Sequence, residues 1–265
     1  MKNFSEKAIS LQRGRLNVST VMAGEIDHNV VGRFSMVRLL GGILLLLVMS
    51  GTETAIVRAD TMHDGQFWFP LYNRFSPSDK VRGWFEINPR FGNDMSEIHQ
   101  LLIRPALGYQ ITPGVSLWQG YAWITNYEPR FTDEHRLYQQ LSYRKKFEGW
   151  NIFSRTRTEQ RFIRDARGVS LRAREFFRMN FSLDDRKQWS FVLYDEIFVS
   201  LNATRNGPRS GFDQNRLFIG LNRKITPHLS MDVGYQNQSI NTSGPRVADV
   251  MNHILLIQWF IDWTD

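Results

Sequence analysis

Cysteine is absent from the 265 residues, and no apolar run is long enough to cross a bilayer as a helix. The first absence excludes a disulfide framework, a thiol nucleophile and a thiolate metal site. The second excludes an ordinary transmembrane helix. Metal-ligand spacings, phosphate-binding loops and cofactor fingerprints are missing too. We therefore expect no metal, no cofactor and no catalytic residue that a motif would identify.

A strong excess of one charge sign is also missing once the N-terminal segment is set aside. The formal net charge is +7, but residues 1–59 hold seven of the 33 Lys and Arg and only four of the 26 Asp and Glu. The rest of the chain is mildly basic, which argues against a nucleic-acid partner. Its length of roughly two hundred residues fits one domain.

Residues 36–59 have the pattern of a secretory signal peptide. Arg38 precedes the short apolar run Leu39–Met49, and small residues precede a junction after Ala59, where we expect cleavage. An uncleaved membrane anchor is the alternative, which the shortness of the run and Glu53 oppose.

The polar stretch before this signal is longer than export signals normally carry. We interpret residues 1–35 as an upstream extension that is not native to the protein, with Met36 as the start. The predicted domains are therefore this extension, the signal peptide 36–59 and a barrel domain over 60–265.

After Ala59 the sequence favours an all-β fold. Short alternating segments are broken by Gly, Pro, Asn and Asp, and no helical periodicity is evident. The predicted strands are 66–75, 80–91, 97–111, 115–127, 135–147, 150–163, 170–183, 188–202, 215–225, 228–241 and 251–263. Brief turns alternate with longer polar loops between them, as in a transmembrane antiparallel β-barrel of roughly 10–12 strands.

The number of strands raises a difficulty, because bacterial barrels normally have an even number and keep both chain ends in the periplasm. We expect either that 66–75 lies outside a ten-stranded barrel or that a twelfth strand exists. Pro70 weakens the first segment as a central strand, since proline cannot donate a ladder hydrogen bond.

An internal sequence repeat supports the strand assignment. Ile111–Tyr121 reads ITPGVSLWQGY and Ile225–Tyr235 reads ITPHLSMDVGY. The same turn and ascending strand occurring twice suggests a duplicated hairpin. The alternative is coincidence, because Thr-Pro suits any tight turn.

The final strand is the most informative segment. From Met251 the chain reads MNHILLIQWFIDWTD, with Leu255, Ile257, Trp259, Ile261 and Trp263 at every second position. A C-terminal strand with one apolar, aromatic-tipped face is where outer-membrane barrels carry the signal for their insertion machinery. The sequence thus predicts the outer membrane of a Gram-negative bacterium, with the insertion machinery and outer-membrane lipid, including lipopolysaccharide, as partners.

Alternation also predicts which face points inward. In 150–163, one parity holds three arginines, which cannot face hydrocarbon, so this parity must line the lumen. Glu175 and Asp195 fall on the opposite, apolar parity, which suggests local bulges or positions near the membrane interface. The same test on all strands gives a charged lumen lining of Arg82, Glu86, Arg90, Arg104, Arg144, Arg155, Arg157, Glu159, Arg161, Arg172, Arg174, Arg178, Glu196, Arg216 and Asp232.

Three segments carry a resemblance to a known family: RPALGYQITPGVSLWQGYAW from Arg104, RTRTEQRF from Arg155 and LYDEIF from Leu193. Over most of residues 64–263 the chain resembles the bacterial outer-membrane barrels of the domain-of-unknown-function family DUF2490. The resemblance implies an outer-membrane barrel and no catalytic activity, because the family has none assigned.

The predicted function has three forms. The lumen arginines either pair with carboxylates in a polar plug, which makes the barrel structural, or line a narrow anion-preferring pore. The third form is an enzyme acting on lipid or lipopolysaccharide, suggested by His99, His135 and His253 at the outer rim. These histidines lack a nearby serine, so contact with lipopolysaccharide phosphates is the simpler interpretation.

Overall fold

The computed structural model describes residues 61–128, 130–242 and 249–263. The predicted upstream extension 1–35 and signal peptide 36–59 lie outside these described residues. In the described part of the chain, no helix is long and apolar enough to cross a membrane. The ordered elements are all strands: β1 (Met62–Trp68), β2 (Leu71–Phe75), β3 (Val81–Gly92), β4 (Glu97–Thr112), β5 (Val115–Asn126), β6 (Thr132–Lys146), β7 (Trp150–Ile163), β8 (Ser170–Ser182), β9 (Trp189–Ser200), β10 (Gly211–Thr226), β11 (Leu229–Ile240) and β12 (Val250–Asp262).

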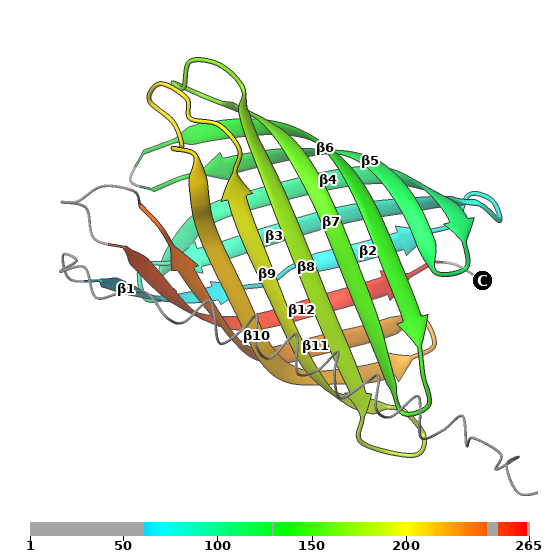
Figure 1. Ribbon diagram of the computed structural model, residues 1–265. Coiled ribbons are helices and arrows are strands. Elements are labelled where there is room, and N and C mark those ends of the chain that lie inside the picture. The colour runs from blue at the N-terminus through cyan, green and yellow to red at the C-terminus, as the bar shows by residue number, and fades with distance from the viewer. Residues whose placement is uncertain (1–60, 129, 243–248, 264–265) are drawn as a thin grey trace, which may run out of the picture. The chain divides into compact units, whose positions relative to one another are not determined.

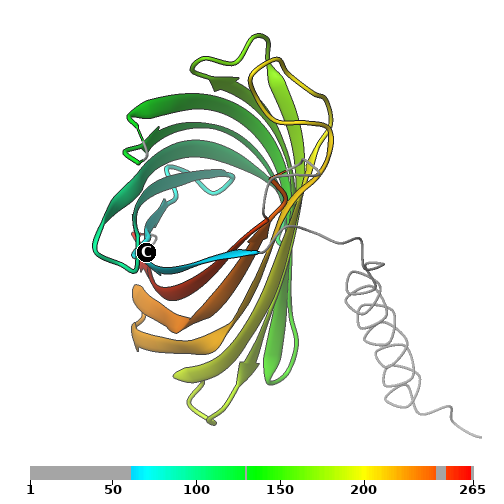
Figure 2. The same ribbon diagram turned by 90° about the vertical axis from the view of Figure 1, so that its left-hand side faces the viewer.

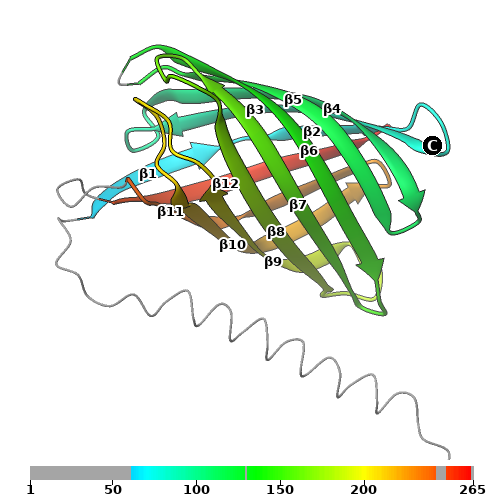
Figure 3. The ribbon, with the colours of Figure 1, turned by 45° about the horizontal axis from the view of Figure 1, so that its top comes forward.

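Each strand from β2 to β12 pairs antiparallel with the next, and the sheet closes into a barrel of steeply inclined strands (Figures 1 and 3). Seen from the end that carries the long loops, the strands follow one continuous ring (Figure 2). The all-β barrel predicted from alternation is therefore confirmed. The predicted strand bounds agree with the observed ones to within a few residues.

Closure is made by a parallel pairing. β1 runs alongside β12 from Met62 opposite Val250 to Trp68 opposite Leu256, and β2 continues beside β12 from Leu71 opposite Trp259. On their other side, both strands pair antiparallel with β3. β1 and β2 thus share one position in the ring, which has eleven positions in all.

Pro70 explains the break between β1 and β2. Proline has no backbone N–H, so the ladder cannot continue through it. The flanking backbone groups still find partners, since Phe69 N donates to Pro89 O at 3.1 Å and Trp259 N donates to Pro70 O at 2.9 Å. The predicted range of roughly 10–12 strands is confirmed by the eleven positions of the ring. The even number was wrong, because the interrupted first segment belongs to the barrel and fills one position.

The parallel closure places the two ends of the described chain at opposite ends of the barrel. β1 starts beside the long loops, whereas β12 ends beside the short turns (Figure 1). The short turns are tightly bonded. In the β8–β9 turn, the backbone N–H groups of Trp189 and Gln188 donate to the carboxylate of Asp184 at 2.6 and 3.1 Å and hold its pKa below the ordinary value.

The outer surface of the barrel is largely apolar. Alternation turns every second residue outward, and large hydrophobic side chains are exposed there on most strands: Leu107, Tyr109, Leu117, Leu141, Tyr143, Leu217, Ile219, Leu221, Tyr235 and Leu255. The interior combines charged residues with a cluster of buried apolar side chains from β1, β8, β9, β10 and β12: Trp68, Phe176, Val192, Tyr194, Phe218, Ile254 and Leu256. The polarity of the fold is thus inverted relative to a water-soluble barrel.

Candidate functional site

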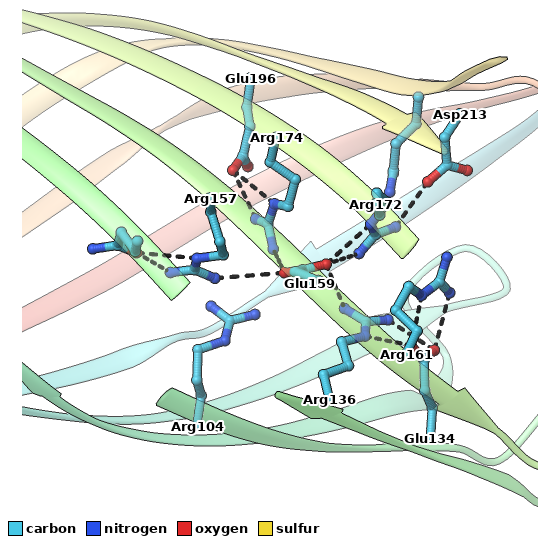
Figure 4. Close-up of polar contacts among 12 residues, drawn as sticks. Arg104, Glu134, Arg136, Arg157, Glu159, Arg161, Arg172, Arg174, Glu196 and Asp213 are labelled. Carbon is cyan, nitrogen blue, oxygen red and sulfur yellow. Dashed lines mark hydrogen bonds and ion pairs between the residues drawn. The ribbon is translucent and has the colours of Figure 1, made fainter. Parts of the chain in front are cut away.

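The most distinctive feature of the interior is a group of paired charges contributed by β6 to β9 (Figure 4). Because strand alternation sends residues two apart to the same face, these side chains meet inside the barrel. We call the group the arginine–glutamate cluster, and it consists of Glu134, Arg136, Glu159, Arg161, Arg172, Arg174 and Glu196.

Glu159 is the centre of the cluster. Its two oxygens accept hydrogen bonds from Arg174 Nη1 at 2.5 Å and from Arg172 Nη2 at 2.6 Å. Two further guanidinium groups approach it, Arg157 at 3.7 Å and Arg136 at 4.0 Å. Only 1% of Glu159 is exposed, so the four arginines replace the water that a carboxylate would otherwise require.

A second carboxylate, Glu134, extends the cluster toward the long loops. It accepts bidentate hydrogen bonds from Arg136 at 2.5 and 2.9 Å and from Arg161 at 2.6 and 3.0 Å. Arg172 also reaches Asp213 at 2.8 Å. Neither Glu134 nor Asp213 was among the residues predicted to line the lumen. Glu134 was identifiable, because it has the same parity as Arg136.

Glu196 binds three arginines from different strands. Its Oε1 accepts from Arg155 Nη2 at 2.5 Å and from Arg174 Nη2 at 2.7 Å, and Arg216 lies 3.9 Å away. One carboxylate therefore connects β7, β8, β9 and β10. Such a network resists separation of the strands, because each partner that leaves uncovers another buried charge.

Two more ion pairs lie apart from the cluster. Arg104 donates to Glu86 at 2.7 Å. Arg178 donates at 2.6 Å to Asp232, which has no exposed surface. Gln258 and Asn222 also donate to the Asp232 carboxylate, at 2.9 and 2.6 Å. Hydrogen-bonded pairing of this kind is the form in which buried charge is stable.

The remaining predicted arginines lack a close carboxylate. Arg82 donates to Gln110 at 2.5 Å and Arg90 donates to Gln100 at 2.6 Å. The Arg144 side chain forms no hydrogen bond or ion pair with any residue that the structure describes, and its guanidinium carbon lies 5.5 Å from the centre of the Phe153 ring. The lumen therefore holds both tightly paired and unpaired cations.

Aromatic rings separate many of these arginines, which the sequence analysis did not anticipate. Arg172, Arg174 and Arg216 lie 5.0, 4.4 and 4.7 Å from the Phe198 ring, and Arg90 lies 3.7 Å from Trp68. Cation–π contacts of this kind are favourable when desolvated. Phe198 has the parity of Glu196, so alternation indicated that Phe198 faces the lumen. Only charged residues were predicted there.

The carboxylates on the outer face are hydrogen-bonded too. Glu175 accepts from Ser154 at 3.0 Å and Thr156 at 2.6 Å, both on the neighbouring strand. Asp195 accepts from Asn215 at 2.8 Å. No register shift occurs at either position, so the suggestion of local bulges was wrong. Neighbouring polar side chains satisfy these groups instead.

Two of the rim histidines occupy matching environments. His135 Nδ1 lies 2.5 Å from the Tyr121 hydroxyl, and His253 Nδ1 lies 2.7 Å from the Tyr235 hydroxyl. Each pair has an interplanar angle of 30°, with centroids 6.0 and 6.1 Å apart. Tyr121 and Tyr235 are the last residues of the two repeated sequence segments. Matching pairs favour duplication of a hairpin over coincidence.

Comparison with known proteins identifies the family of this chain. Residues 65–249 match the family described as "Protein of unknown function (DUF2490)". The chain belongs to this family. It is also 34% identical over 223 residues to an uncharacterised protein of Methylorubrum extorquens, covering 82% of this chain and 94% of that protein. No solved structure matches this DUF2490 protein.

Proposed function

We propose that this DUF2490 protein is an integral outer-membrane β-barrel of a Gram-negative bacterium, with a lumen that the arginine–glutamate cluster seals. Its role is then structural rather than solute-conducting. The single observation that carries the proposal is the inverted polarity of the closed barrel, apolar outside and charged inside. A barrel facing water would place its charges outward and its apolar side chains inward, whereas a bilayer requires the reverse.

Burial of the cluster supports a sealed lumen. Glu159 is 1% exposed, and Arg172, Arg174 and Glu196 are 3–4% exposed. In a wet pore of this width, water would reach these side chains. At the level of the cluster, arginine and aromatic side chains instead fill the space, as they fill the interiors of barrels of about eight strands.

The lengths of the connections suggest the orientation. Outer-membrane barrels keep short turns in the periplasm and long loops outside. By this rule the β2–β3, β4–β5, β6–β7, β8–β9 and β10–β11 turns face the periplasm together with the end of β12. The end of the lumen nearest Glu134 and the long loops then faces the cell exterior.

The proposed partner at the exterior rim is lipopolysaccharide. Tyr121 with His135 and Tyr235 with His253 form paired amphipathic side chains on the outer face near the long loops. Arg130 is well exposed in the next loop. Tyrosine, histidine and arginine are suited to the headgroup level, where arginine binds phosphate through charge-assisted hydrogen bonds.

A fractionation experiment tests the location. The protein, expressed in a Gram-negative host, is expected to sediment with the outer membrane and to migrate faster on cold gels before boiling than after it. Folded barrels retain compact structure in cold detergent, and boiling supplies the unfolded control from the same sample. Recovery in the soluble periplasmic fraction, or identical migration before and after boiling, would contradict the proposal.

An anion-preferring pore is the second candidate. The observation that favours it is the group of lumen arginines without a close carboxylate, Arg82, Arg90 and Arg144, because a cationic lining concentrates anions. A pore needs a continuous wet path, which the burial of Glu159 opposes. Conductance distinguishes the two candidates.

A further inference from the structure

Two adjoining hollows lie in the lumen, one at the short turns and one deeper inside. The outer one has a volume of 660 Å³ and is bordered by turn residues such as Ser78 and Pro113. The inner one has a volume of 340 Å³ and reaches Trp68. We call them together the vestibule. Six residues line both hollows, Arg74, Trp84, Arg144, Phe153, Arg155 and Arg157.

The vestibule is strongly cationic. Its lining holds ten arginines and Lys146 against four carboxylates. Three of these carboxylates are already engaged: Glu86 with Arg104, Glu196 with Arg155 and Arg174, and Asp262 with Arg74. The excess positive charge is therefore not neutralised within the lining, and it favours an anion there.

Two arginines are placed to receive that anion. Arg157 is 3% exposed, and its Nη1 has no hydrogen-bond partner; the nearest carboxylate oxygen, that of Glu159, lies 3.7 Å away. Arg144 is exposed at the end of β6 near the mouth, and its side chain has neither a hydrogen bond nor an ion pair to any described residue. A buried guanidinium N–H without a hydrogen-bond partner, as at Arg157 Nη1, is uncommon in proteins. An entering carboxylate would satisfy both.

The walls between these arginines are aromatic. Trp84 and Phe153 line both hollows, and Phe176 and Tyr194 line the inner one, where Arg155 lies 4.6 Å from the Phe176 ring. A concave site with apolar walls and a few fixed polar groups is characteristic of small-molecule binding, for which hollows of about 300–1,000 Å³ are usual. The vestibule combines both properties.

We propose that the vestibule binds a small planar organic anion, such as an aromatic carboxylate, that enters from the short-turn end. Arg144 receives the carboxylate at the mouth, and Arg157 holds it deeper inside, while the planar body lies against Trp84 and Phe153. Inorganic anions would use the arginines but leave the aromatic walls uncovered. This binding site goes beyond the proposed structural role and depends on neither membrane location nor conductance.

Calorimetric titration of the full folded barrel in a neutral aliphatic detergent tests this site. The probes are benzoate, its neutral analogue benzamide and inorganic phosphate, at constant ionic strength. We expect benzoate to bind at least about tenfold more tightly than either control, because only benzoate offers both a charge-assisted partner and a planar body. Absence of benzoate binding, or phosphate binding of equal affinity, would overturn the proposal.

Variants then assign the binding to the vestibule. Arg144→Gln removes a side chain that bonds to nothing else described, so the barrel should fold normally and lose about tenfold in benzoate affinity. Arg157→Gln should have an effect of the same size, provided that cold gel migration shows it folded. The matched control is Arg130→Gln, an exposed arginine in the long β5–β6 loop. Wild-type affinity in Arg144→Gln, or an equal loss in Arg130→Gln, would place any binding elsewhere and refute the site.

Discussion

Glu159 and Glu196 share one guanidinium, that of Arg174. Arg174 Nη1 donates to Glu159 at 2.5 Å, while Nε and Nη2 donate to Glu196 at 3.1 and 2.7 Å. The two carboxylates stand on different strands, β7 and β9, with Arg174 on β8 between them. Neither carboxylate can lose its charge without leaving part of a buried guanidinium unpaired. The cluster therefore behaves as one unit.

Replacing Glu196 tests whether the arginine–glutamate cluster excludes water. In Glu196→Gln, the guanidinium groups of Arg155 and Arg174 lose a charged partner inside the barrel. Removal of one partner from a buried pair costs about 3–5 kcal/mol, so the unfolding temperature should fall markedly. The measurement is thermal unfolding followed by circular dichroism or cold gel migration.

The matched control for Glu196→Gln is Glu128→Gln, an exposed position beyond the end of β5. This substitution should change the unfolding temperature little, because surface changes usually alter stability by less than about 0.5 kcal/mol. Equal unfolding temperatures for Glu196→Gln and the wild type would indicate that water screens the arginines.

The terminal strand should be essential for assembly. Truncation before Gln258 removes every β12 residue that pairs with β2, from Trp259 to Asp262, and leaves only the β1 pairing to close the ring. Trp263→Ala removes the final aromatic residue, whose ring N–H donates to Asn73 at 3.1 Å, and the signal expected for the insertion machinery. Both variants should accumulate unassembled in the periplasm. Cold gel migration like that of the wild type would count against this role.

The parallel closure predicts that the start of β1 and the end of β12 lie on opposite sides of the membrane. With the short turns in the periplasm, β1 begins at the cell surface, since Met62 pairs with Val250 at the long-loop end. An epitope inserted between Asp60 and Thr61 should label on intact cells, as should one in the β9–β10 loop. An epitope after Asp265 should label only after permeabilisation. Labelling of the N-terminal epitope only in permeabilised cells would refute this topology.

Much of the barrel could be predicted from the sequence because strand alternation is a local property. The eleven predicted segments correspond to the observed strands, and the predicted 66–75 segment covers β1 and β2 with the interruption at Pro70. The partner of the first segment could not be predicted, because alternation states which face is apolar but not which strand lies beside it. A general rule of even strand number then suggested ten or twelve strands.

The types of residue in the candidate site could be predicted better than the contacts between them. Parity places Arg155, Arg157 and Glu159 on one face of β7, but pairing depends on register between strands. Arg172 therefore binds Glu159 and Asp213, residues 13 and 41 positions away in sequence. The aromatic lining was missed because Phe198 was not considered beside its charged neighbours. Applying the parity test to every residue type would have found it.

Single-channel recording of the purified wild-type barrel in planar bilayers tests the central claim most directly. The cluster buries Glu159 to 1% exposure, so the sealed lumen should give no stable conductance steps in potassium chloride. Heat-unfolded protein provides the baseline, and insertion into the bilayer is verified by cold gel migration of the recovered protein. Reproducible chloride-selective steps from the folded wild-type protein would contradict the sealed lumen and establish the anion pore in its place.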